Sequence, residues 1–182
     1  QIDEFLNDPL RHRYLSVAAD TRDVYSGCQV KRVREDGTCG VYGLSVTHAK
    51  DIDDYITVSD KAFERGAGFG VLVHELCHVI INTMEGTPEE QAVIAEFTKT
   101  FDDMEKRPTN SKDQPLPDAQ LAEEMACDYF IQFTGVAPTP WVSGYVGSYR
   151  SNAGMKSADF DISLSQTLVL RDLTDKYLEL YG

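Results

Sequence analysis

Basic side chains are scarce in this sequence: 17 Lys and Arg residues stand against 30 Asp and Glu residues, so the formal net charge is -13 at pH 7. A surface this acidic repels the phosphate backbone, and we therefore do not expect nucleic acid to bind through a basic face. The same charge favours metal cations and basic peptides as ligands.

Long apolar runs are absent as well, since no stretch of the chain approaches the ~20 residues that a membrane-spanning helix needs. The first residues also lack the basic segment and apolar segment that form a signal peptide. We expect a soluble protein with no membrane span. Because the chain begins with Gln1 and not Met, we expect an upstream segment to have been removed, which leaves a cytoplasmic and a secreted location equally open.

Cysteines are too few for a disulfide scaffold in a chain of 182 residues, which contains Cys28, Cys39, Cys77 and Cys127. Cys28 and Cys39 flank a predicted hairpin turn whose register does not place them opposite each other. Cys77 and Cys127 each follow a predicted metal ligand by three residues, so both are expected where two helices meet. There they are either small buried residues or a bridge.

The sequence has one segment in which charged and imidazole side chains interrupt an apolar helix, and we place that helix at about residues 68–83. His74, Glu75 and His78 form the pattern H-E-x-x-H, and residues four apart lie on one face of a helix, so both imidazoles can reach the same Zn²⁺ ion. Burying such groups without partners costs several kcal/mol, and a metal ion would offset that cost. Zinc lowers the pKa of a bound water to roughly 7, and Glu75 would accept its proton.

A hydrolytic zinc site needs a third protein ligand and one open position. The extended pattern with a third His would require His at position 84, where this chain has Met84. The predicted helix at 119–133 has Glu124 and Asp128 four residues apart on one face, so we predict that Glu124 binds zinc and that Asp128 accepts the Nδ1 proton of a ligand His. Glu123 and Asp128 remain alternative third ligands, and all three acids could instead form a solvated helix face.

Together, the H-E-x-x-H pattern of His74, Glu75 and His78 and the later Glu124-x-x-x-Asp128 resemble the gluzincin branch of zinc metallopeptidases. Thermolysin-like, HtpX-like and ImmA/IrrE-like proteins share this pairing. The separation of the two motifs is longer here than in thermolysin-like enzymes, because a capped helix and a proline-containing loop lie between them.

The resemblance implies an α+β, zincin-like fold in which a small mixed β-sheet packs against the active-site helix and further helices follow. It implies that an edge strand, assigned to residues 55–59, holds an extended peptide substrate. It also implies that Glu75 serves as general base and acid and that a Tyr, His or Arg side chain stabilises the oxyanion. Tyr145, Tyr149 and Arg150 are the candidates for that last role.

Apolar periodicity and capping residues predict the remaining elements. The expected strands are 29–34, 38–45 and 55–59, and the expected helices are 8–19, 88–106 after a capping box at Thr87, 119–133, and a closing helix capped by Asp161 or Ser163. Core positions are predicted at Val93, Phe97, Phe101 and Met104, and in the closing helix at Leu164, Leu168, Leu173, Tyr177 and Leu178. Gly66, Gly68 and Gly70 are interpreted as sites of close backbone packing.

The sequence therefore predicts one zincin-like domain, residues 1–182, that uses Zn²⁺ to hydrolyse bonds in a peptide or protein substrate. One alternative is a zincin-fold regulator or toxin that acts on a single partner. Another is a non-catalytic binding domain supported by zinc, in which a fourth protein ligand such as His48 or Asp128 closes the site.

Overall fold

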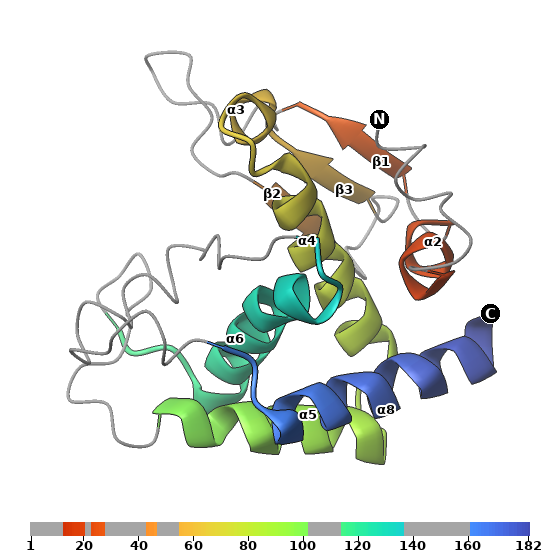
Figure 1. The fold of residues 1–182 in the computed structure, drawn as a ribbon, viewed down its shortest axis with the longest axis vertical. Helices are drawn as coiled ribbons and strands as arrows, with labels where there is room; N and C mark the ends of the chain where they lie inside the picture. Colours follow the sequence, from red (N-terminus) through yellow and green to blue (C-terminus); the bar gives the residue numbers. More distant parts are fainter. Residues whose placement is uncertain (1–12, 21–22, 28–42, 47–54, 102–113, 137–160) are drawn as a thin grey trace.

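The computed structural model describes residues 13–20, 23–27, 43–46, 55–101, 114–136 and 161–182, and it has the predicted mixed α+β composition (Figure 1). Its strands are β1 (Asp23–Ser26), β2 (Gly43–Val46) and β3 (Tyr55–Val58). Its helices are α2 (Arg13–Asp20), α3 (Asp60–Glu64), α4 (Gly68–Thr83), α5 (Pro88–Thr98), the 3-10 turn η2 (Lys99–Phe101), α6 (Asp118–Phe133) and α8 (Leu164–Tyr181). No helix among these residues is long and apolar enough to cross a membrane.

The three described strands form one mixed sheet in the order β1-β3-β2, with β1 parallel and β2 antiparallel to β3. The strand predicted at residues 55–59 is confirmed as β3, but its assignment to an edge is wrong because a strand pairs with it on each side. Ile56, Thr57 and Val58 are all buried, as expected for a strand whose two faces are both covered. Of the described strands, β2 is the outer one next to α4.

Helix α4 has the predicted bounds and packs on β2 and β3. Its first residue, Gly68, lies so close to Phe63 of α3 that a Cβ atom there would collide with the aromatic ring. Gly66 has a φ of +73° in the turn between α3 and α4, which favours glycine. The predicted close packing is thus confirmed at Gly68. It is wrong at Gly66, where an added Cβ atom would meet nothing within 4 Å, and at Gly70 such an atom would make only an ordinary contact with Ile131.

The helices that follow form the second half of the fold: α6 packs between α4 and α5, and α8 lies along α5 (Figure 1). Helix α5 begins as predicted, since the Thr87 hydroxyl accepts a hydrogen bond from the Glu90 amide at 3.2 Å. The Glu90 carboxylate accepts from the Gly86 amide rather than from that of Thr87, so the reciprocal half of the capping box is displaced by one residue. The predicted core positions Val93, Phe97 and Phe101 are buried.

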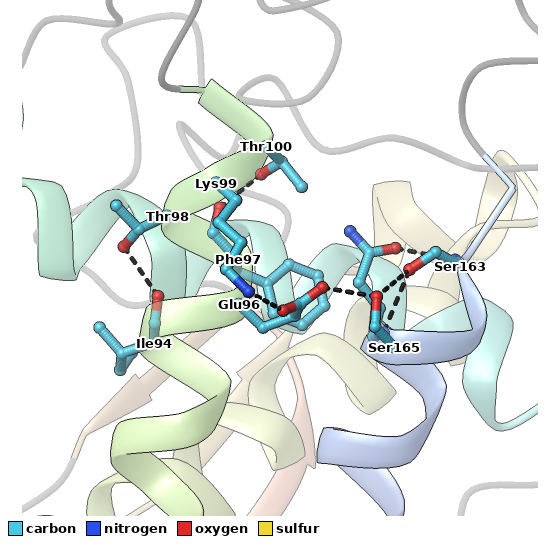
Figure 2. A network of polar contacts seen from close by, with 9 residues as sticks. Ile94, Glu96, Phe97, Thr98, Lys99, Thr100, Ser163 and Ser165 are labelled. Atoms are coloured by element: carbon cyan, nitrogen blue, oxygen red, sulfur yellow. Dashed lines mark hydrogen bonds and ion pairs between the residues drawn. The ribbon is translucent and has the colours of Figure 1, made fainter.

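Helix α8 is capped by Ser163 and Gln166 in a complete capping box. Glu96 of α5 accepts a hydrogen bond from Ser165 at 2.6 Å and pairs with Lys99 at 2.6 Å, which ties the end of α5 to the first turn of α8 (Figure 2).

The predicted burial of Leu164 and Leu168 is wrong, since these side chains are 75% and 38% exposed. The buried face of α8 consists instead of Gln166, Leu170, Leu173, Thr174 and Tyr177. Leu164 and Leu168 lie two residues before Gln166 and Leu170, about 200° round the helix, so they face away from the buried side of α8.

Several predictions concern residues outside the described ranges. They include the strand at 29–34, the first part of the strand at 38–45, the start of the first helix, Met104, and the pair Cys28 and Cys39. The last part of the strand at 38–45 corresponds to β2. Strand β1 was not predicted, because its four residues are too few to show an alternating pattern.

Candidate metal centre

His74 and His78 present their imidazoles side by side from the same face of α4. Their Nε2 atoms lie 3.2 Å apart, and the two rings meet edge to face. The spacing of one helical turn places them together, and the packing of α4 against the sheet and α6 buries the helix almost completely. The predicted relation between the two imidazoles is present in the structure.

Glu124 brings a carboxylate from α6 to the same point. Its Oε2 atom lies 3.4 Å from Nε2 of His74 and 3.7 Å from Nε2 of His78. Among the residues that the structure describes, His74, His78 and Glu124 form a group that could hold a metal ion. Two helices that are far apart in sequence therefore supply the predicted donor set.

The spacing of these three atoms fits a small divalent ion. Ligand atoms 2.0–2.1 Å from a tetrahedral Zn²⁺ ion lie about 3.3 Å from one another. The observed separations of 3.2, 3.4 and 3.7 Å are close to that value, and a point about 2 Å from all three atoms lies near the middle of their triangle. Two imidazoles and one carboxylate are also the donor types that zinc takes in hydrolytic sites.

The Nδ1 atom of each imidazole, on the side away from Glu124, lies next to a further carboxylate of α6, a different one for each ring. Nδ1 of His74 lies 2.9 Å from Oδ1 of Asp128, so the predicted pair is in contact, but the two atoms are not aligned for the hydrogen bond that was predicted between them. Nδ1 of His78 donates a hydrogen bond to Oε1 of Glu123 at 2.6 Å. The sequence reasoning left Glu123 as a solvated residue or an alternative ligand and missed this role. The only signal was that Glu123 adjoins Glu124 on a helix otherwise rich in buried residues.

These carboxylates control the charge of the imidazoles in the protein without a metal ion. Burial of His78 disfavours its charged form, but Glu123 and Glu124 outweigh this effect and raise its pKa to about 10. Burial likewise opposes protonation of His74, whose pKa is nevertheless raised by Asp128 and Glu124. Burial opposes ionisation of Glu124, yet the two imidazoles lower its pKa to about 2. The carboxylates around His74 and His78 therefore stabilise positive charge on the two imidazoles.

Glu75 lies next to His74 on α4, and its side chain is buried at 8% exposure. Strand β2 passes close over it, since a Cβ atom added to Gly43 would lie 2.6 Å from Oε1 of Glu75. Within the described part of the chain, no residue makes a hydrogen bond to this carboxylate. The backbone of β2 thus limits the space around Glu75, whose oxygens have no hydrogen-bond partner among the described residues.

Cys77 and Cys127 lie one turn after His74 and Glu124 on their respective helices, and both are fully buried. They are free thiols, so the alternative of a bridge between α4 and α6 is wrong and the alternative of small buried residues is confirmed. Burial and the neighbouring Cys77 thiol raise the pKa of Cys127 well above its usual range. The two thiols fill the space between the helices behind the site.

The other candidates from the sequence, His48, Tyr145, Tyr149 and Arg150, lie outside the described residues. Comparison with family models, curated proteins and solved structures finds no match to this chain.

Proposed function

We propose that this chain is a zinc-dependent metallopeptidase of the zincin type, which hydrolyses peptide bonds in a peptide or protein substrate. The observation that carries the proposal is the triangle of His74 Nε2, His78 Nε2 and Glu124 Oε2, with Glu75 beside it on the same helix. Zinc, a residue that can transfer protons and a buried setting are the requirements of metal-assisted hydrolysis.

The number of ligands supports a catalytic rather than a structural site. Structural zinc sites are usually closed by four protein ligands, whereas hydrolytic sites use three and keep one position open. The ligand group found in the described ranges has three members. Asp128 contacts the Nδ1 side of His74, away from the triangle, so its observed position does not close the site. His48, the other fourth ligand named in the non-catalytic alternative, lies outside the described residues.

Each residue then has a distinct task. His74, His78 and Glu124 would hold the ion, which when bound acidifies a water molecule and polarises the scissile carbonyl. Glu75 would accept a proton from the attacking water and pass it to the leaving amine. The lack of a hydrogen-bonding partner for Glu75 among the described residues leaves its oxygens free to make both transfers.

Strand β2 is the outer strand of the described sheet on the side of Glu75, and Gly43 brings its backbone against that residue. The free edge of a strand can pair with an extended peptide through main-chain hydrogen bonds. We assign substrate binding to this edge, because a peptide paired with β2 would pass near Glu75 and the triangle. The role that the sequence assigned to residues 55–59 thereby moves to β2.

The test is the substitution Glu75→Gln, which keeps the size of the side chain and removes its basicity. We expect zinc content to be unchanged and hydrolysis of a mixed peptide library to fall by roughly 10²- to 10⁴-fold. Glu85→Gln is the matched control, since Glu85 is exposed just after α4 and its loss removes the same charge.

Full activity in a zinc-loaded Glu75→Gln protein would contradict the proposal, as would a wild-type protein that binds no zinc. Cleavage of one protein alone, with no activity on the library, would narrow the function to a regulator with a single partner.

A further inference from the structure

We propose that Glu123 is a positioning residue for the metal centre, which acts by holding His78 in the tautomer and orientation that a metal ligand needs. This inference rests on the proposed metal site at His74, His78 and Glu124. It assigns a task to a residue that touches neither the ion nor the substrate.

The first support is the geometry of His78. Its Nδ1 atom is 2.6 Å from Oε1 of Glu123, which is shorter than the ~2.7–2.9 Å usual for a charge-assisted N–H to carboxylate bond. Its Nε2 atom faces the other way, 3.2 Å from His74 and 3.7 Å from Glu124. A neutral imidazole that donates through one nitrogen has a lone pair on the other. The Glu123 contact therefore directs the lone pair of His78 into the triangle.

The second support is a similar pairing at His74, where the contact is an ion pair without the alignment of a hydrogen bond. Asp128 lies 2.9 Å from Nδ1 of that residue, so each imidazole has its own carboxylate on the side away from the triangle. Both carboxylates come from α6, one residue before and four residues after Glu124. Helix α6 thus supplies the third ligand and a carboxylate beside Nδ1 of each imidazole. Such contacts fix the ring and raise its basicity as a ligand.

The same geometry argues against the other roles of Glu123. Its oxygen contacts the Nδ1 side of His78, so it cannot join the triangle unless it gives up that bond. Its side chain is 22% exposed, well below the exposure of a freely solvated Glu on a helix surface. The residue is held in place by His78 and by the packing of α6 on α4.

The experiment compares zinc affinity in wild type, Glu123→Ala and Glu123→Gln by competition with a chromogenic chelator. We expect Glu123→Ala to weaken zinc binding by about 10- to 100-fold. Glu123→Gln should recover part of that loss, because its amide oxygen still accepts the bond from Nδ1. The exposed Glu85→Ala is the control for the loss of one negative charge and should bind zinc as wild type does.

A second measurement separates positioning from a general effect on folding. In the zinc-loaded protein, NMR of the imidazole protons should show the Nδ1–H signal of His78 far downfield. We expect that signal to move in Glu123→Gln and to exchange rapidly or disappear in Glu123→Ala, while the Nδ1–H signal of His74 stays in place. Glu123→Gln is nearly isosteric, so it remains a valid test if Glu123→Ala does not fold.

The outcomes distinguish this inference from the proposed function. A wild-type protein that binds no zinc overturns the metal site itself. A wild-type protein that binds zinc, together with Glu123 variants of unchanged affinity and an unchanged His78 signal, overturns the role of Glu123 alone.

Discussion

Nε2 of His74 and Nε2 of His78 lie 3.2 Å apart, and one oxygen of Glu124 approaches both. Two neutral imidazoles in this arrangement would direct two lone pairs toward each other and toward a carboxylate, which is unfavourable without a positive charge among them. In the metal-free protein protons supply that charge, as the raised pKa of His78 indicates. A divalent ion would replace them, because metal binding requires neutral imidazoles and releases their protons.

Removal of the third ligand should therefore remove the metal. We expect the wild-type protein to hold stoichiometric zinc and Glu124→Ala to bind it more than about 100-fold more weakly, since loss of a ligand should cost more than loss of an outer contact. Elemental analysis and chelator competition measure both values. Equal zinc content in wild type and Glu124→Ala would show that another residue is the third ligand.

The stability of the metal-free protein should depend on the charge of His78. Its pKa is about 10 in the folded protein and about 6.5 when unfolded, so protonation of this ring stabilises the fold fully below pH 6.5. That contribution should be lost as the pH rises from 6.5 toward 10. Urea unfolding at a series of pH values, with a chelator present, measures the decline.

Zinc supplies the control for this pH effect. In the zinc-loaded protein His78 is already neutral, so the same decline should be absent, and zinc affinity should increase with pH as fewer protons must be displaced. A metal-free protein whose unfolding free energy stays constant over this range would contradict the assignment.

Gly43 should be intolerant of a side chain because of Glu75. The Cβ atom in Gly43→Ala would lie 2.6 Å from Oε1 of Glu75 and would also collide with Val71. We expect the Glu75 carboxylate to be displaced, which would reduce hydrolysis at least tenfold with zinc affinity preserved, and we expect a stability loss of about 1–3 kcal/mol.

The matched control is Gly70→Ala on α4. There the new Cβ atom meets Ile131 at an ordinary contact distance of 3.7 Å, and alanine in a helix should stabilise the protein by about 0.5–1 kcal/mol. If Gly43→Ala retained full activity, Gly43 would have no role in shaping the site.

The orientation of α8 can be tested with two leucines of the same helix. Leu173→Ala should reduce the free energy of unfolding by about 2–5 kcal/mol, because Leu173 is fully buried. Leu164→Ala should change it by less than about 0.5 kcal/mol, because Leu164 is 75% exposed. Urea unfolding measures both, and a large loss in Leu164→Ala would mean that another part of the protein or a partner covers this residue.

Local chemistry in the chain was sufficient to predict helix α4 and the two imidazoles on one of its faces. Helical spacing is set by backbone geometry, so His74 and His78 must lie on one face wherever the helix packs. The caps at Thr87 and Ser163 were predictable for the same reason, since a side chain that accepts from an amide three residues later needs no distant partner.

The tertiary structure alone decided how elements distant in sequence meet. Three features depend on packing between distant segments, which local sequence patterns do not predict. They are the central position of β3 in the sheet, the buried face of α8 and the contact of Glu123 with His78. In the sequence, a glutamate that is exposed to solvent looks the same as a glutamate that orients an imidazole. Only the docking of α6 against α4 makes Glu123 a partner of His78, because hydrogen bonds depend on distances that the folded chain sets.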